Sequence, residues 1–202
     1  MYSKNRDSIS RITIMAILCA ATVVLQTLGA MFPLKVAGIS ISLVLIPITV
    51  SAYFFGIRGG LIIGTAFGLT VFVHSIIGLD AAGATIFAMN PIFTFLITTV
   101  RGALAGLLAG IVADATVKIN HSFLRALIIG ICAPIFNTSI FLLFYATLFN
   151  DLLVEGAATY GFGNNIFSFV IIGLVGINFI FELLTTALLA PPVCKAMEKV
   201  NK

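Results

Sequence analysis

Residues 91–115 read PIFTFLITTVRGALAGLLAGIVADA, an almost unbroken run of apolar and small residues with one arginine, Arg101, in its interior. At about 1.5 Å per residue, a helix of this length spans about 38 Å. The hydrocarbon core of a bilayer is only about 30 Å thick. The segment therefore predicts a membrane-crossing α-helix.

The rest of the chain has the same character. Of its 202 residues, 60% are hydrophobic and 9% are charged, whereas soluble domains are about 25% charged; the mean hydropathy is +1.20. So few charges cannot cover the surface of a soluble domain. We therefore predict an all-α membrane protein, a single transmembrane domain over residues 1–202. We expect a six-helix bundle with crossings at roughly 12–30, 39–57, 60–79, 91–115, 123–148 and 164–190, the last ended by Pro191-Pro192.

The distribution of basic residues predicts the orientation, because cytoplasmic loops carry an excess of Lys and Arg. With the N-terminus inside, the outer side has one such residue, Lys35, beside the acidic Asp80, Asp151 and Glu155. We therefore expect both termini to be cytoplasmic and the chain to be a multi-pass protein of the cell (plasma) membrane. The inner side would carry Lys4, Arg6, Arg11, Arg58, Lys118, Arg125, Lys195, Lys199 and Lys202.

Polar side chains inside hydrocarbon are costly and indicate either helix packing or a binding site. Asn90, Thr94, Thr98 and Arg101 have helical spacing and form one polar stripe. Arg101 lies about 15 Å along that helix from Asn90. A guanidinium at this depth is suited to binding a carboxylate that enters from outside. The alternative is an internal salt bridge between Arg101 and Glu182.

Three more polar residues complete the candidate substrate-binding set. Asn137 follows Pro134, which removes a backbone hydrogen bond, and its alternative role is hydrogen bonding between helices. Asn178 shares a helix face with Glu182, for which we favour a structural role. His74 lies near the outer end of its helix and can also be an interfacial residue. The full set is Arg101, Asn137, Asn90, Asn178, His74 and Thr98.

Two further patterns concern helix packing and the excluded functions. Small residues spaced by four occur at Ala16-x-x-x-Ala20 and in two glycine stripes, 60/64/68 and 102/106/110, and predict close helix contact. Motifs of nucleotide-binding, metalloprotease and hydrolase sites are missing from the sequence. The three cysteines follow no metal-ligand spacing, and the basic residues are scattered singly. We therefore expect no enzyme, no cofactor, no metal site and no nucleic-acid partner.

In the order and spacing of its motifs, the chain resembles the substrate-binding S components of energy-coupling factor (ECF) vitamin transporters, and most of all their pantothenate-binding branch. The resemblance covers essentially the whole chain. The motifs that carry it are Ala16-x-x-x-Ala20, SLVLIP at 42–47, Asn90-Pro91, Arg101 with the glycine stripe after it, PIFNT at 134–138 and NFIFE at 178–182.

The resemblance implies a subunit that binds a vitamin at its outer face. It also implies association with a membrane T component and two cytoplasmic ATPase subunits, with Ala16 and Ala20 at the contact with the T component. Pantothenate is the first choice of vitamin, and folate, riboflavin or pyridoxine are alternatives. Outside this family, the sequence is also compatible with a self-sufficient small membrane facilitator or with a structural membrane subunit that has no ligand.

Overall fold

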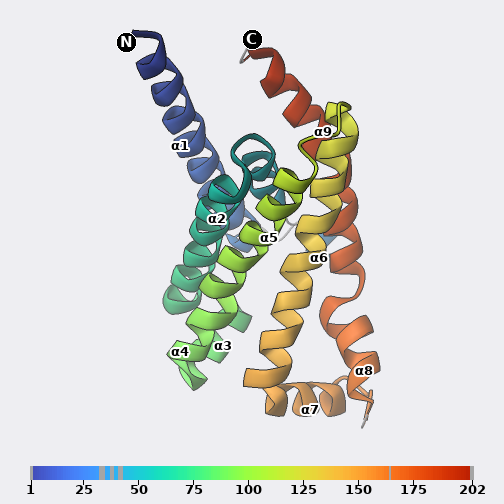
Figure 1. Cartoon of the computed structure of the whole chain (residues 1–202). Coiled ribbons are helices and arrows are strands. Elements are labelled where there is room, and N and C mark those ends of the chain that lie inside the picture. The colour runs from blue at the N-terminus through green and yellow to red at the C-terminus, as the bar shows by residue number, and fades with distance from the viewer. Residues whose placement is uncertain (1, 32–34, 37–38, 41–42, 164, 201–202) are drawn as a thin grey trace.

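The computed structural model describes residues 2–31, 35–36, 39–40, 43–163 and 165–200. Ser42 of the 42–47 motif and Lys202 lie outside the described residues. The described chain is helical apart from one short antiparallel strand pair, in which Lys35 lies opposite Ser40. Along the chain the elements are α1 (Tyr2–Met31), β1 (Lys35–Val36), β2 (Ile39–Ser40), α2 (Leu45–Ile77), α3 (Ala81–Met89), α4 (Pro91–Phe95), the π-helix η1 (Leu96–Val100), α5 (Arg101–Ala115), α6 (Ser122–Leu148), α7 (Asn150–Thr159), α8 (Ile166–Ser168), the π-helix η2 (Phe169–Val175) and α9 (Gly176–Val200) (Figure 1).

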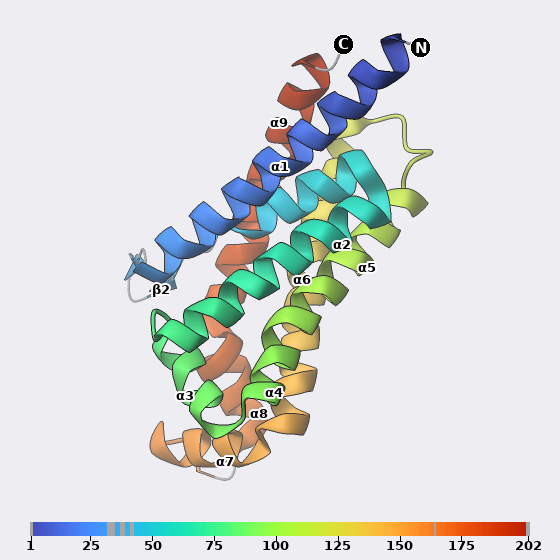
Figure 2. The ribbon, with the colours of Figure 1, turned by 90° about the vertical axis from the view of Figure 1, so that its left-hand side faces the viewer.

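The number of membrane-crossing helices differs from the sequence prediction. Among the described residues, five helices are long and apolar enough to cross a bilayer. Most of the predicted windows 39–57 and 60–79 lies on α2, which bends at Gly56, close to the boundary between the two windows, and doubles back (Figure 2). Only 11 residues of α2 precede the bend, about 16 Å of helix, which is too short to span the hydrocarbon core. A sixth crossing is therefore not confirmed.

Backbone geometry and charge explain the bend in α2. Gly56 has φ 58° and ψ −143°, a conformation that residues with a side chain rarely adopt. A Cβ at this position would also overlap the Asp114 carboxylate. The amide of Ile57, at the start of the second half of α2, donates to Asp114 Oδ2 at 3.4 Å. Asp114, near the end of α5, therefore supplies an acceptor for a helix start that has none of its own.

Close contact between α2 and α5 forms the centre of the bundle. A Cβ on Gly60 would overlap the carbonyl of Gly106, and one on Gly64 would overlap the carbonyl of Gly102. The two glycine stripes therefore face each other and allow the backbones to touch, which confirms the close packing predicted from their spacing. The part of α2 before its bend is covered by neighbours, with Ile48 and Ala52 0% exposed.

Other helix boundaries also depart from expectation. The prediction that Pro191-Pro192 ends the last helix is wrong, because α9 continues through both prolines to Val200. Proline's fixed φ is compatible with a helix, so its cost here is limited to the lost hydrogen bonds and local crowding. The predicted window 164–190 is divided among α8, η2 and α9. The connections expected at 80–91 and 150–163 contain α3 and α7, of which α7 lies across the end of the bundle (Figure 1).

The start of α1 and the end of α9 lie at the same end of the bundle, opposite α3 and α7 (Figure 1). That both ends lie on one side of the membrane, and that this side is the cytoplasm, remain predictions from the Lys and Arg distribution.

The glycine contact generates a prediction about stability. We expect Gly106→Val to lower the free energy of unfolding by about 1–3 kcal/mol or more, because its side chain would overlap the Gly60 carbonyl and separate α2 from α5. The matched control is Gly29→Val on α1, where an added Cβ meets no atom within 4 Å. Thermal unfolding of the two purified variants in detergent measures the difference. Equal midpoints would contradict the proposed role of the contact.

Candidate functional site

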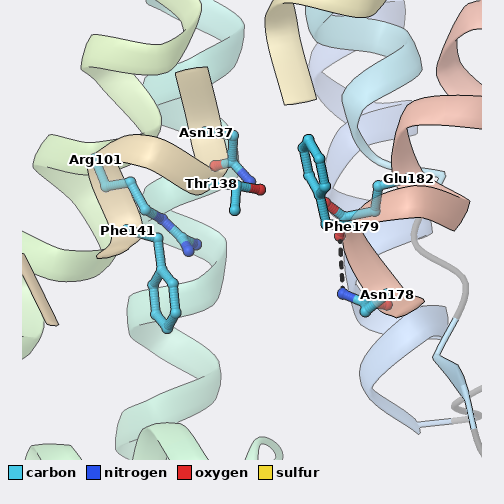
Figure 3. A pocket seen from close by; sticks show the side chains of 7 residues that line it. All are labelled: Arg101, Asn137, Thr138, Phe141, Asn178, Phe179 and Glu182. Atoms are coloured by element: carbon cyan, nitrogen blue, oxygen red, sulfur yellow. Dashed lines mark hydrogen bonds between the residues drawn. The ribbon is translucent and has the colours of Figure 1, made fainter. Parts of the chain in front are cut away.

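A polar cavity of about 210 Å³ lies among α5, α6 and α9. At about 30 Å³ per water, this volume corresponds to roughly seven waters. Two of its lining residues, Arg101 and Asn178, lie at or near the starts of α5 and α9, and both helices begin toward the end of the bundle that carries α4 and α8 (Figure 1). Its lining residues are Arg101, Asn137, Thr138, Phe141, Asn178, Phe179 and Glu182 (Figure 3).

Arg101 is the first residue of α5 and directly follows the π-helix η1. A π-helical stretch inside a longer helix shifts the faces of the turns that follow and often occurs at functional sites. The guanidinium carbon lies 5.2 Å from the ring centre of Phe141 and 5.6 Å from that of Phe67. These two rings stabilise and orient the cation. The Nε atom is shut off from solvent and has no hydrogen-bond partner among the described residues.

The helix α6 contributes an amide, a hydroxyl and a ring from one face. Asn137, Thr138 and Phe141 are within one helical turn of each other and point into the cavity (Figure 3). Asn137 is 7% exposed, and its Oδ1 has no hydrogen-bond partner in the part of the chain that the structure describes. A buried amide oxygen without a partner is costly, so this atom is a candidate acceptor for a ligand.

The opposite wall is formed by α9. Asn178 Nδ2 donates to Glu182 Oε1 at 3.4 Å (Figure 3). Figure 3 shows Arg101 and Glu182 entering the cavity from opposite sides. Within the described ranges, no nitrogen–oxygen pair of these two residues is close enough for a salt bridge. The internal Arg101–Glu182 ion pair, which was the alternative to ligand binding, is not formed in this structure.

Two predicted members of the polar stripe are engaged in their own helix. Asn90 Oδ1 accepts from the amides of Ile92 and Phe93 at 3.0 and 3.1 Å and so caps the start of α4. The hydroxyl of Thr98 donates to the carbonyl of Thr94 at 2.7 Å. Neither Asn90 nor Thr98 lines the cavity, and a ligand role for either stays a prediction.

His74 and the two alanines of α1 also lie away from the cavity. His74 Nε2 is 3.1 Å from Thr27 Oγ1, a hydrogen bond that links α2 to α1. Ala16 and Ala20 are exposed on α1, whereas Leu18 and Thr22 on its other face are buried. The alanines are therefore on the outside of the bundle, where a partner helix could reach them.

Sequence reasoning left four lining residues out of the predicted binding set: Thr138, Phe141, Phe179 and Glu182, the last of which was assigned a structural role. Thr138 and Phe179 are the sequence neighbours of two predicted residues, and Phe141 is one turn beyond Asn137. Phe141 also begins a row of rings that follows α6 to its end, with ring centres 5.4 Å apart for Phe141 and Tyr145 and 5.9 Å apart for Tyr145 and Phe149, the residue after the helix. Aromatic residues are common in membrane helices, so residue type alone does not indicate that Phe141 or Phe179 lines a cavity. Among the described residues, no cluster of His, Cys, Asp or Glu could hold a metal ion.

The described helices thus form an apolar bundle of the kind that crosses a membrane, with a polar cavity among three of them. The sequence matches the family described as "ECF transporter, substrate-specific component" over residues 10–194. The chain therefore belongs to this family of substrate-binding membrane subunits, which are parts of transporters and not enzymes. No curated protein sequence matches the chain.

The capping geometry of Asn90 generates a prediction. We expect Asn90→Ala to lower the free energy of unfolding by about 0.5–2 kcal/mol, because the amides of Ile92 and Phe93 lose their acceptor. Asn90→Asp keeps an acceptor oxygen and is the matched control, expected to retain most of the stability. Thermal unfolding in detergent measures both. If Asn90→Ala unfolds like the wild type, Asn90 is not a stabilising cap.

Proposed function

We propose that the chain is the vitamin-binding subunit of an ATP-driven ECF importer and that the cavity among α5, α6 and α9 binds the carboxylate of the vitamin. Pantothenate is our first choice. The family match supports a substrate-binding role, and the polar cavity provides a site of suitable chemistry. The position of the cavity, away from the end that carries both termini, is consistent with entry from outside if the termini are cytoplasmic.

The observation that carries the proposal is the Arg101 guanidinium, which faces the cavity, forms no direct salt bridge within the described residues and has a buried Nε atom without a hydrogen-bond partner. A cation removed from water is costly unless it is paired. Phe67 and Phe141 stabilise it from the side, but aromatic rings give less than an anion does. A ligand carboxylate would supply that anion and can bind the planar guanidinium through two parallel hydrogen bonds.

The chemistry of the cavity ranks the candidate vitamins. Pantothenate has one carboxylate, which suits Arg101, and an amide and hydroxyl groups that can donate to Asn137 Oδ1. Riboflavin and pyridoxine have no carboxylate and would leave the guanidinium unpaired. Folate also has carboxylates, and because the cavity is open on one side, size alone does not exclude it. Pantothenate is preferred because its carboxylate, amide and hydroxyl groups all have partners among the lining residues.

The same proposal includes a membrane T component and two cytoplasmic ATPase subunits as partners. Ala16 and Ala20 support a docking surface, because they are small, exposed and one turn apart on α1. Small residues allow the backbones of two membrane helices to approach closely. On a helix that meets lipid alone, any apolar residue would serve equally well.

The first test removes the proposed anion-binding group. We expect Arg101→Ala to weaken pantothenate binding to the purified protein by more than about 2 kcal/mol, because a charge-assisted hydrogen-bonded pair is lost. Isothermal titration calorimetry measures the affinity, and mass spectrometry of the denatured wild type identifies any vitamin that co-purifies. The control, Arg58→Ala, removes an exposed arginine outside the cavity. Unchanged binding by a folded Arg101→Ala protein would mean that Arg101 is structural.

The second test addresses the partner surface. We expect Ala16→Trp combined with Ala20→Trp to abolish vitamin uptake in cells while binding by the purified subunit is retained, because the bulky rings block docking and lie away from the cavity. Leu184→Trp combined with Leu188→Trp is the control on α9, where the exposed side chains are already large. Uptake by liposomes that contain this chain alone would instead establish the self-sufficient facilitator.

A further inference from the structure

The cavity carries ionisable groups of opposite type on opposite walls. Arg101 enters from α5 and Glu182 enters from α9 (Figure 3). A direct salt bridge between them would fill the space and neutralise both, yet the described residues form none. The cavity therefore lies between a cationic wall at Arg101 and an acidic wall at Glu182, and the two groups are not in direct contact.

Glu182 has unused capacity to accept hydrogen bonds. Its Oε1 accepts from Asn178 Nδ2 at the long distance of 3.4 Å, and in the described structure this is its single side-chain partner. A carboxylate has two oxygens with about four lone-pair positions. Because desolvation of an acidic group is costly, the remaining positions are suited to donors that a ligand brings into the cavity.

We propose that Glu182 determines substrate specificity by accepting hydrogen bonds from hydroxyl or amine groups at the end of the ligand opposite its carboxylate. The substrate class is therefore a bipolar small acid, with the carboxylate on Arg101 and the donors on Glu182. Asn137 lies between the two walls and presents Oδ1 to the middle of such a molecule. This inference rests on the proposed function and adds the second recognition element to it.

The position of Glu182 opposite Arg101 would discriminate among carboxylic acids as well as add to their affinity. An acid whose far end is apolar would satisfy Arg101 but would remove water from Glu182 without replacing its hydrogen bonds. Sites built to hydrogen-bond a substrate reject analogues that lack the hydrogen-bonding group far more strongly than apolar sites reject a small change in size. The acidic wall therefore excludes simple apolar carboxylates, which are abundant near a membrane.

Two probes separate the donors from the carboxylate. Pantothenate has both the hydroxyl donors and the carboxylate. N-(3,3-dimethylbutanoyl)-β-alanine, the dideoxy analogue, has the same skeleton and carboxylate but neither hydroxyl. Calorimetry on the purified wild type should show at least about tenfold tighter binding of pantothenate, since a hydrogen bond to a charged group contributes about that factor to affinity and the analogue cannot form one. Equal affinities of the wild type for the two probes would overturn the proposal without any variant.

The variant Glu182→Gln keeps the size of the side chain and removes its charge. We expect it to weaken pantothenate binding about tenfold or more and to leave the binding of the dideoxy analogue unchanged. A merely structural role for Glu182 would weaken both probes alike and would overturn the inference. Glu155→Gln makes the same chemical change on an exposed residue of α7 outside the cavity, and it should affect neither probe.

A retention experiment distinguishes failure of this inference from failure of the proposed function. The wild type is incubated with an equimolar mixture of the water-soluble vitamins and the dideoxy analogue, washed, denatured and analysed by mass spectrometry. Retention of a compound with a carboxylate and a distal donor supports the inference, and its affinity for Glu182→Gln is then compared in the same way. Retention of an acid without such donors overturns this inference alone. Retention of no compound overturns the proposed function and this inference together.

Discussion

The contact between the glycine stripes of α2 and α5 determines where the functional groups of this bundle lie. Gly102 directly follows Arg101, and a Cβ at Gly102 would meet the carbonyl of Gly64 at 2.5 Å. Because the two backbones touch there, Arg101 is held beside Phe67 of α2, while Phe141 approaches its guanidinium from α6. Larger residues in the stripes would move α5 away and break this enclosure. The same contact between α2 and α5 therefore determines both the helix packing and the position of the Arg101 charge.

Irregular backbone is concentrated around the same site. The π-helix η1 ends at the residue before Arg101, and η2 ends at Val175, three residues before Asn178. Gly176 has φ 32°, so the chain leaves regular helix geometry just before the acidic wall begins. Non-helical backbone within a membrane is tolerated where protein or a cavity covers it. These breaks turn polar side chains of long apolar helices toward a common space.

Charge separation across the cavity is the basis of the proposed function. An isolated cation or carboxylate inside an apolar bundle is costly, and direct pairing would be the simplest relief. The described structure instead gives Arg101 two aromatic rings and gives Glu182 the amide of Asn178. Both groups keep free hydrogen-bonding capacity toward the cavity. A bipolar ligand would complete the two hydrogen-bonding sets at once, which links its binding to the stability of the bundle.

Several features followed from the sequence alone because they depend on local composition. The membrane class, the helix at 91–115 and the close glycine packing follow from apolar length and small-residue spacing, and the family match agrees with the resemblance carried by the motifs. The free-energy cost of a polar side chain in hydrocarbon also indicated Arg101, Asn137 and Asn178 as site residues, and the structure brings these three to one cavity. The same reasoning selected Asn90, Thr98 and His74, which do not line this cavity, because sequence cannot show which polar groups the packed helices bring together.

The tertiary structure decided what depends on relations between distant segments. The chain bends at Gly56, where Asp114 of α5 supplies an acceptor for the helix start that follows, and only 11 residues of α2 precede this bend. The last helix, α9, continues through the two prolines that were expected to end it. Glu182 was assigned a structural role from its sequence position, yet it faces Arg101 across open space without pairing. Apolar periodicity determined that this chain enters a membrane as helices. Which polar groups meet inside it was decided only by how those helices pack, because facing residues are set by interhelical contact and not by spacing along one helix.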